Sequence, residues 1–194
     1  NKIRNASEIK FKGNKELIEI IGQAIDDEYI KELTTISLSP EAISRHKDMK
    51  IVYTPIHGTG VKLVPAALKA YGFTNIIHVP EQDVVSGDFP TVISPNPEEP
   101  AALAMAVEKA KETDAELVMA SDPDADRVGA AVKNNEGEWV LLNGNQTALM
   151  FVYYLITRWK ELGKINGKEY IVKTIVTTCL LYTSPSPRDR QKSR

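Results

Sequence analysis

The stretch Leu117-Val-Met-Ala-Ser-Asp-Pro-Asp-Ala-Asp-Arg127 places three carboxylates at alternate positions directly after a short apolar run. They belong to Asp122, Asp124 and Asp126. Two carboxylates about 4 Å apart repel by roughly 4 kcal/mol at an effective dielectric constant near 20, so three ionised and unpaired groups would cost on the order of 10 kcal/mol. A divalent cation relieves this repulsion, so residues 122–127, the Asp loop, are a candidate metal site.

The Asp loop has two other interpretations. The aspartates could point separately into water, with Arg127 as their counter-ion. A helix–loop–helix calcium site requires glycine at loop position six and glutamate at position twelve. Counted from Asp122, these positions hold Arg127 and Lys133, so that class of site does not fit. Oxygen ligands with no His or Cys nearby favour a hard ion, magnesium first, with water or a phosphate group completing its coordination.

Upstream of the Asp loop, short apolar runs alternate with amphipathic segments. Strands are expected at 50–53, 75–79 and 117–120, and helices between them at 61–70 and 98–112. Strands separated by helices imply a parallel sheet with right-handed crossovers, which carries its ligand loops at the carboxyl ends of the strands. The glycine-rich turn at 55–60 and the Asp loop are therefore expected at the same edge of the sheet.

After the Asp loop the pattern predicts an antiparallel hairpin. Its strands are expected at 128–132 and 138–142, and Gly137 in the connecting turn permits a positive φ. Further helices are expected at 14–33, 40–48 and 145–162, and a buried strand at 169–177. Apolar side chains of the last helix are expected to be core and domain contacts: Met150, Phe151, Tyr153, Tyr154 and Trp159. The fold class is a three-layer α/β/α mixed sheet, followed by the start of a second α/β domain.

Residues 179–194 are interpreted as an artefact. The segment Cys179-Leu-Leu-Tyr-Thr-Ser-Pro-Ser-Pro-Arg-Asp189 back-translates in one reading frame to a transposon-type sequencing-library adapter. A natural disordered basic tail is the alternative, since Pro, Ser and Arg suit one. Without this segment the chain has no cysteine, so disulfides, a thiolate nucleophile and a zinc knuckle are not expected. The chain also opens at Asn1 rather than Met, so an N-terminal portion is expected to precede it.

Charge and composition limit the classes of binding partner that are expected for this chain. The chain has a net charge of −2, and residues 179–194 contribute four basic residues and one acidic residue, so residues 1–178 carry −5. This balance gives no support to nucleic-acid binding. The hydrophobic content of 42% and charged content of 26% are those of a globular protein. No apolar run or signal peptide indicates a membrane partner, so a cytoplasmic location is expected.

Three motifs occur in the order typical of the α-D-phosphohexomutases, the family of phosphoglucomutases and phosphomannomutases. They are 53–60 (Tyr-Thr-Pro-Ile-His-Gly-Thr-Gly), the two mid-domain pieces 87–92 and 95–99, and the Asp loop. The family usually carries Gly at the second or fourth place of that loop, where this chain has Pro123 and Ala125. This form resembles the phosphoglucomutase-two and phosphopentomutase-like branch.

The resemblance implies a domain organisation. Residues 1–13 would be the tail of domain I, 14–139 the α/β/α domain II with its metal loop, and 140–178 the truncated start of domain III, with 179–194 as the artefact. The phosphoserine of the family is expected outside this chain, as are the sugar-discriminating loop and the distal phosphate-binding domain. The chain alone is therefore expected to be inactive and to carry no catalytic nucleophile.

The resemblance also implies a function. The parent enzyme would be an isomerase, a Mg²⁺-dependent phosphosugar mutase that moves a phosphoryl group between the 1- and 6-positions of a hexose, or the 1- and 5-positions of a pentose. Asp122, Asp124 and Asp126 would hold the metal, and Arg127 would contact the phosphoserine or the sugar phosphate. The sugar and the oligomeric state are left open. The alternative is a metal-dependent phosphate-binding or regulatory module without catalysis.

His57 and Gly58 are weaker candidates. The turn that contains them could offer backbone N–H groups to an anion at the following helix. The preferred interpretation is that glycine permits a tight turn while His57 orients the loop by hydrogen bonding. The Gly58-Thr59-Gly60 spacing is too short for a P-loop or a full dinucleotide fingerprint.

Overall fold

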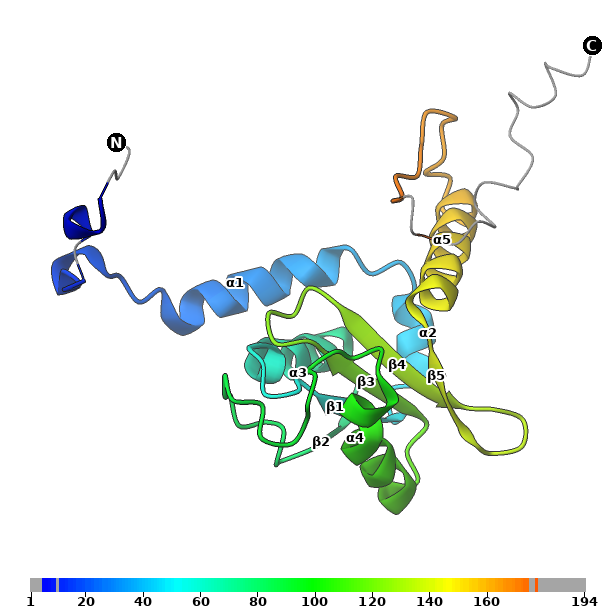
Figure 1. The fold of residues 1–194 in the computed structure, drawn as a ribbon. Helices are drawn as coiled ribbons and strands as arrows, with labels where there is room; N and C mark the ends of the chain where they lie inside the picture. Colours follow the sequence, from blue (N-terminus) through cyan, green and yellow to red (C-terminus); the bar gives the residue numbers. More distant parts are fainter. Residues whose placement is uncertain (1–4, 10, 175–176, 178–194) are drawn as a thin grey trace, which may run out of the picture.

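A five-stranded mixed sheet forms the centre of the computed structural model, which describes residues 5–9, 11–174 and 177 (Figure 1). The strands are β1 (Lys50–Thr54), β2 (Asn75–His78), β3 (Leu117–Ser121), β4 (Val128–Lys133) and β5 (Trp139–Leu142), in the spatial order β2-β1-β3-β4-β5. The helices are α1 (Gly22–Thr35), α2 (Pro40–Arg45), α3 (Gly60–Tyr71), α4 (Pro100–Thr113) and α5 (Gly144–Glu161), preceded by two short 3₁₀ helices, Ala6–Glu8 and Lys15–Leu17.

The sheet changes from parallel to antiparallel at β3. Strand β1 pairs in parallel with β2 and with β3, and β3, β4 and β5 pair antiparallel. The β4–β5 turn closes with the Asn134 amide donating to the Glu138 carbonyl at 2.8 Å, and Gly137 adopts φ 82°. The predicted mixed α/β sheet is confirmed, including the hairpin.

The two faces of the sheet are covered by different helices. On one face Val52 and Val118 pack against α4 through its buried residues Ala102, Leu103, Ala106 and Ala110. Three of these four are alanines, so α4 can lie close to the sheet. Because side chains alternate along a strand, Ile51 and Tyr53 point to the other face, where α3 lies and α1 packs on α3. The result is a three-layer α/β/α unit.

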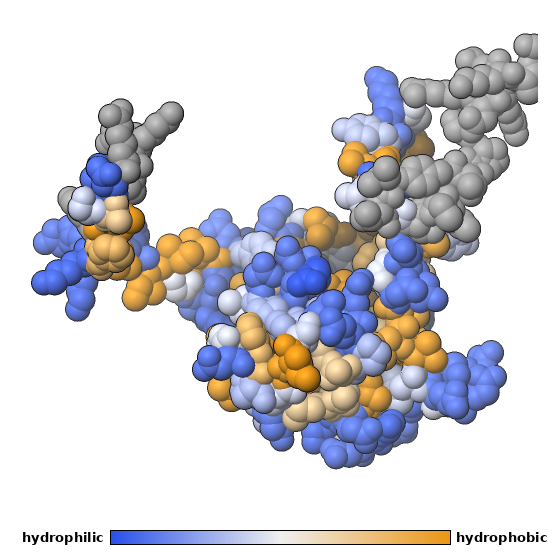
Figure 2. Space-filling model, viewed as in Figure 1, coloured by the Kyte–Doolittle hydropathy of each residue, from blue (hydrophilic) through white to orange (hydrophobic). Residues whose placement is uncertain are grey.

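The predicted helix at 14–33 is wrong in its first part. Residues Lys15–Leu17 form a 3₁₀ turn, and the α-helix begins at Gly22, whose φ of 59° interrupts a right-handed path. Leu17 and Ile20 are 84% and 90% exposed, so their apolar spacing has no surface to pack against. Apolar surface is exposed along the N-terminal arm (Figure 2), which extends away from the sheet (Figure 1).

The short helix α2 ends three residues earlier than predicted, at Arg45. Ser39 does not cap it, because its side chain makes no hydrogen bond to the helix N-terminus and instead pairs with the Tyr154 hydroxyl at 2.8 Å. Arg158 of α5 donates to the Leu38 carbonyl at 2.8 Å and to the Glu41 carboxylate at 2.9 Å. These polar contacts join α5 to the start of α2.

The region from α5 onward departs most from expectation. The predicted strand at 169–177 is wrong for 169–174, where the backbone is irregular and Tyr170 and Val172 are 84% and 83% exposed. The reason is that no strand of the described chain lies beside it to pair with. The α5 residues expected as core contacts are 39% to 75% exposed for the same lack of a covering layer. Among the helices described, none is long and apolar enough to span a membrane.

Candidate metal centre

Two loops meet at the carboxyl edge of the parallel strands. Residues 55–59, the His57 loop, follow β1, and the Asp loop follows β3; the strands pair Thr54 with Ala120 at their ends. The Thr59 amide and hydroxyl both donate to the Pro123 carbonyl, at 2.9 and 3.1 Å. A Cβ on Gly58 would overlap Pro123 Cα and lie 2.7 Å from its carbonyl oxygen. Glycine is required here because the two backbones touch.

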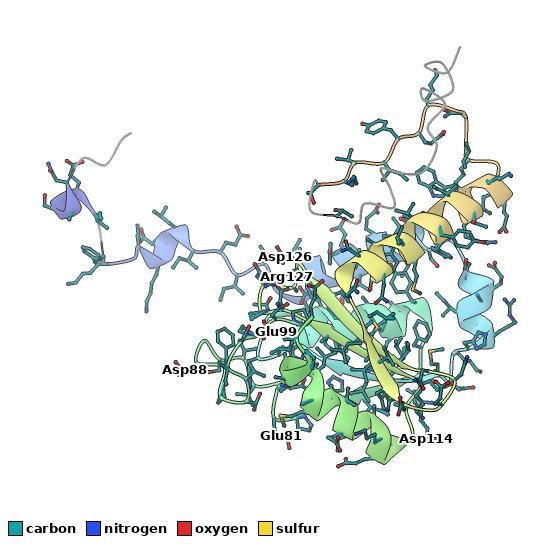
Figure 3. The ribbon with its side chains drawn as sticks, turned by 45° about the vertical axis from the view of Figure 1, so that its right-hand side comes forward. Glu81, Asp88, Glu99, Asp114, Asp126 and Arg127 are labelled. Carbon is teal, nitrogen blue, oxygen red and sulfur yellow. The ribbon has the colours of Figure 1, made fainter. Side chains whose placement is uncertain are left out.

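The loop that precedes α4 touches strand β4 just after the Asp loop. Gly129 lies against Pro97, and a Cβ at Gly129 would overlap the Pro97 carbonyl. Figure 3 shows Asp126 and Arg127 together at one end of the sheet, with Asp114 at the other end. The start of β4, two residues beyond the Asp loop, is therefore packed against the loop that precedes α4.

Asp122 is the buried member of the loop, with 1% of its surface exposed. Its Oδ1 accepts the amides of Asp126 and Arg127 at 3.1 and 3.0 Å, and its Oδ2 accepts Arg127 Nε at 2.7 Å. Burial alone would raise the pKa of Asp122, but the hydrogen bonds from Arg127 and its charge outweigh burial and lower the pKa. Asp122 is thus an ionised anchor that shapes the turn.

Asp124 and Asp126 are exposed beside this anchor. One carboxylate oxygen from each of the three aspartates lies within 4.8 Å of the others. Repulsion from Asp124, then from Asp122, raises the pKa of Asp126. Arg127 Nε lies 2.7 Å from Asp122 and 3.7 Å from Asp126, and it offsets this repulsion only in part. Three oxygen donors that still repel one another match what a hard divalent cation requires, so these residues fit the predicted metal.

Arg127 is fixed at one end only. Its Nε bonds to Asp122, which raises the guanidinium pKa, while the side chain is 56% exposed. A guanidinium carries further N–H groups on its two terminal nitrogens, in a fork that matches phosphate oxygens. The group is therefore aimed by Asp122 and open to an anion beside the three carboxylates.

Ala125 stands at the tightest point of the loop. Its amide donates to the Asp122 carbonyl at 3.0 Å, and its φ is 59°, in the left-handed region. This geometry explains why glycine suits the position, because a Cβ is disfavoured there.

His57 does not reach the Asp loop with its side chain. It is 1% exposed, with Nδ1 2.8 Å from the Val84 carbonyl and Nε2 2.8 Å from the Thr91 hydroxyl. Both ring nitrogens are thus used within the protein, which favours the loop-orienting interpretation over direct substrate contact. Sequence reasoning missed the partners Thr91 and Gln82, because polar residues in a long loop carry no periodic signal.

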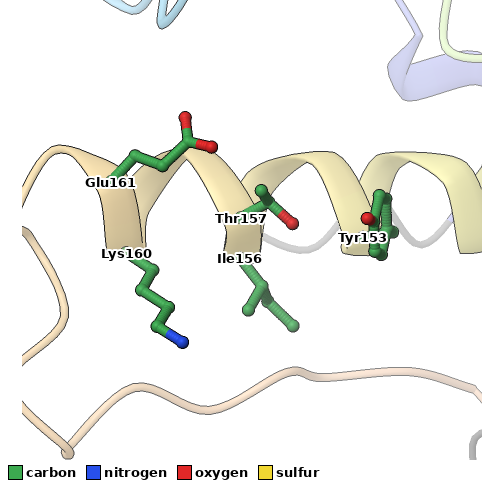
Figure 4. A pocket seen from close by; sticks show the side chains of 5 residues that line it. All are labelled: Tyr153, Ile156, Thr157, Lys160 and Glu161. Atoms are coloured by element: carbon green, nitrogen blue, oxygen red, sulfur yellow. The ribbon is translucent and has the colours of Figure 1, made fainter.

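A surface hollow on α5 is separate from this centre. Figure 4 shows Tyr153, Ile156, Thr157, Lys160 and Glu161, which line it from this one helix. None of these residues belongs to the Asp loop, the His57 loop or the loop that precedes α4. The chemistry of the sheet edge, rather than the presence of a hollow, identifies the candidate site.

Comparison with known proteins agrees with this fold. Residues 27–137 match the family model described as phosphoglucomutase/phosphomannomutase, alpha/beta/alpha domain II. The solved structure of a phosphoglucomutase/phosphomannomutase family protein from Burkholderia thailandensis superposes with a TM-score of 0.55 at 24% identity, over 69% of this chain and 26% of that one. The chain therefore belongs to the phosphoglucomutase/phosphomannomutase family of α-D-phosphohexomutases.

Two curated relatives define its branch. The chain is 40% identical over 136 residues to a protein named probable phosphoribomutase from Schizosaccharomyces pombe, covering 70% of this chain and 23% of that protein. It is 37% identical over 162 residues to human phosphopentomutase, covering 81% of this chain and 26% of that protein. The chain thus spans about a quarter of the length of these relatives and lies in the phosphopentomutase-like branch.

Proposed function

We propose that this chain is the metal-bearing part of a Mg²⁺-dependent phosphosugar mutase. The observation that carries the proposal is the cluster of Asp122, Asp124 and Asp126, with the guanidinium of Arg127 beside it. The parent enzyme would interconvert sugar 1-phosphates and 6-phosphates, or the 1- and 5-phosphates of a pentose. The similarity to phosphopentomutase and phosphoribomutase makes the pentose reaction a specific candidate.

The residues of the chain would act by positioning charge. The three aspartates would bind Mg²⁺, which supplies positive charge to neutralise the transferring phosphoryl group. Asp122 would hold Arg127 through Nε, so that the terminal nitrogens can bind phosphate oxygens of the substrate or of a phosphoserine. Close contact of the Asp loop with the His57 loop would limit the movement of these groups.

The remaining parts of the reaction would come from other segments of the parent protein. We assign 1–13 to the tail of domain I, 14–139 to domain II and 140–178 to the start of domain III. A phosphoserine and a sugar-discriminating loop would lie outside these segments, so the chain alone would not turn over substrate. Residues 179–194, assigned to the adapter artefact, lie outside the described residues. A cytoplasmic location stays a prediction from the sequence.

Calorimetric titration of the 194-residue chain with Mg²⁺ and with Mn²⁺ tests the metal site. Asp124→Asn should weaken binding at least about tenfold, because it removes one charged ligand of three. The matched control is Asp114→Asn, which removes the same charge at the opposite end of the sheet (Figure 3), from a side chain that is 86% exposed. Equal affinities for wild type and Asp124→Asn would contradict the proposal.

Activity is tested in the full-length parent protein. Sugar 1-phosphates of hexoses and pentoses should be converted in the presence of Mg²⁺, and Arg127→Lys should lose activity because a lysine cannot offer the forked donors. Metal binding without any mutase activity in that protein would instead favour the phosphate-binding or regulatory module.

A further inference from the structure

A buried polar network lies behind the His57 loop, on the side away from solvent. Thr54 and Gln82 are fully buried and His57 is 1% exposed. We propose that His57 is a positioning residue that, through this network, fixes the His57 loop and thereby the Asp loop that rests on it. The consequence for metal affinity rests on the proposed function, whereas the consequence for loop order does not.

The hydrogen bonds of the network have one consistent direction. The Val84 carbonyl can only accept, so His57 Nδ1 carries the hydrogen. In a neutral imidazole Nε2 then accepts, so the Thr91 hydroxyl donates to it at 2.8 Å. Thr91 in turn accepts from Gln82 Nε2 at 3.2 Å, and Gln82 Oε1 accepts from the Thr54 hydroxyl at 2.7 Å. Each donor has an acceptor, and this series of hydrogen bonds runs from β1 to the loop that precedes α4.

The backbone of the turn depends on the same segments. Ile56 and His57 have φ of 46° and 62°, which non-glycine residues adopt only when their surroundings hold them there. The Ile56 amide donates to Thr54 Oγ1 at 3.1 Å, and the His57 amide donates to the Gln82 carbonyl at 2.8 Å. The His57 carbonyl accepts the Ser86 amide at 3.1 Å. The side chain and backbone of His57 therefore bind the same 82–91 segment.

The constraint passes to the Asp loop by direct contact. Gly58 and Thr59 follow His57 immediately. Gly58 lies so close to Pro123 that a Cβ would overlap it, and Thr59 donates two hydrogen bonds to the Pro123 carbonyl. Pro123 lies between Asp122 and Asp124, so a shift of the His57 loop moves two carboxylates relative to each other. No flexible side chain intervenes to absorb the shift.

Hydrogen exchange in the metal-free chain tests the positioning directly. His57→Asn suits the left-handed φ and keeps an amide donor near the Val84 carbonyl, but it is too short to reach Thr91. We expect the Thr59 and Asp126 amides to exchange about tenfold faster in this variant, the effect of losing one hydrogen bond. Thr91→Val, which removes the same contact from the other side, should have the same effect.

The control is Leu103→Ala, which removes core packing of α4 and none of the side-chain hydrogen bonds of the network. Where these amides exchange through local opening rather than global unfolding, Leu103→Ala should leave the exchange rates of the Thr59 and Asp126 amides within about twofold of wild type. Unchanged exchange in both His57→Asn and Thr91→Val would overturn the inference. Equal acceleration in Leu103→Ala would also overturn it, because the role of His57 would then be general stability.

Two further measurements separate this inference from the proposed function. Nitrogen-15 NMR of the imidazole should show the Nδ1–H tautomer, and the Nε2–H tautomer would overturn the direction of the network. Mn²⁺ titration should show affinity weakened about tenfold in His57→Asn and unchanged in Leu103→Ala. If wild type binds neither Mn²⁺ nor Mg²⁺, the metal function fails, and the exchange experiment still decides whether His57 positions the Asp loop.

Discussion

The His57 loop and the Asp loop leave neighbouring parallel strands and touch each other, yet their polar groups are satisfied in opposite ways. In the His57 loop every residue from Pro55 to Gly58 is buried, and the ring nitrogens of His57 both have partners. In the Asp loop only Asp122 is buried, while Asp124 and Asp126 face solvent and repel each other. One loop is complete without a ligand and the other is not.

This difference suits the two loops to different roles, one structural and one in binding. A loop with all its hydrogen bonds made can hold a neighbouring backbone in place, because moving it would break several bonds at once. A loop whose carboxylates still repel one another beside a single arginine can bind a cation, because binding reduces the repulsion. The contact between Gly58 and Pro123 joins the two properties in one edge of the sheet.

The largest expected effect comes from separating the two loops. Gly58→Ala places a methyl group against Pro123 Cα and 2.8 Å from the Pro55 carbonyl, and both neighbours are backbone that cannot rotate away. We expect a loss of about 3 kcal/mol in the free energy of unfolding, as for overpacked cores. Urea denaturation followed by circular dichroism measures this loss.

Gly87→Ala is the matched control for that substitution, because a Cβ there meets nothing within 4 Å. Its effect should stay within about 0.5 kcal/mol, as for ordinary surface positions. If Gly58→Ala costs no more than Gly87→Ala, the two backbones are not in contact as described.

The second-largest effect is expected when the ionised carboxylate of Asp122, which anchors the Asp loop, is removed. Asp122→Asn keeps an oxygen for the two backbone amides but turns an NH₂ group toward Arg127 Nε, so that two donors face each other. We expect a loss of about 2 kcal/mol at neutral pH, the value of hydrogen bonds to a charged group. Chemical denaturation at a series of pH values measures it.

The pH dependence of this loss has a defined sign. Because the native pKa of Asp122 is below its ordinary value of 3.8, its ionised form stabilises the fold above pH 3.8. That contribution disappears as the pH falls through the lowered native pKa, so wild type and Asp122→Asn should converge there. Asp88→Asn, at an exposed loop position, should show no such convergence. A difference that stays constant into strong acid would contradict the ionised anchor.

The parts of the fold that were predicted correctly have local signals. Apolar runs of strand length mark β1 and β3. Gly72 ends α3 and Gly137 lies in the turn between β4 and β5, and both have a positive φ. The errors at 14–21 and 169–174 share one cause. Periodic apolar residues show that a segment could be buried, but they do not show whether a surface lies beside it.

The candidate site also has a part that could be predicted from the sequence and a part that could not. The three aspartates are close in sequence, so their repulsion and their metal preference follow from spacing alone. The network of Thr54, Gln82 and Thr91 joins the end of β1 to two places in the loop between β2 and α4, and its residue types are common in loops. Only the pairing of β1 with its neighbours and the path of the 79–99 loop bring them to His57. Physical contact of this kind has no signature in a single sequence.

A smaller effect of opposite sign is expected at the exposed carboxylates. Asp126→Asn should raise the melting temperature of the metal-free chain, because it removes a charge repelled by Asp124 and Asp122. The raised native pKa of Asp126 means that ionisation destabilises the fold, so the gain is full above that pKa and is lost as the pH falls below 3.8. Differential scanning fluorimetry across this range measures it.

Added Mg²⁺ should reverse the order of stability of wild type and Asp126→Asn. Wild type should gain stability with Mg²⁺ and overtake Asp126→Asn, because ligand binding to the native state stabilises by mass action. Asp88→Asn should respond to Mg²⁺ as wild type does. A melting temperature of Asp126→Asn below that of wild type without metal would show that the carboxylates are not in conflict.

The smallest expected effect concerns the strain at Ala125. Its φ of 59° costs an alanine about 1–2 kcal/mol relative to the right-handed region, whereas a glycine there loses about 0.5–1 kcal/mol in backbone entropy on folding. Ala125→Gly should therefore stabilise the chain by about 0.5 kcal/mol, and Ala125→Val should destabilise it, because β-branched residues tolerate this region least. Since Ala125 is exposed and its side chain makes no buried contact, these changes report backbone conformation alone. Denaturation midpoints of the three variants in one buffer measure the order Gly, Ala, Val. If valine were tolerated as well as glycine, the Asp loop would not hold a left-handed turn, and the spacing of its three carboxylates would need another cause.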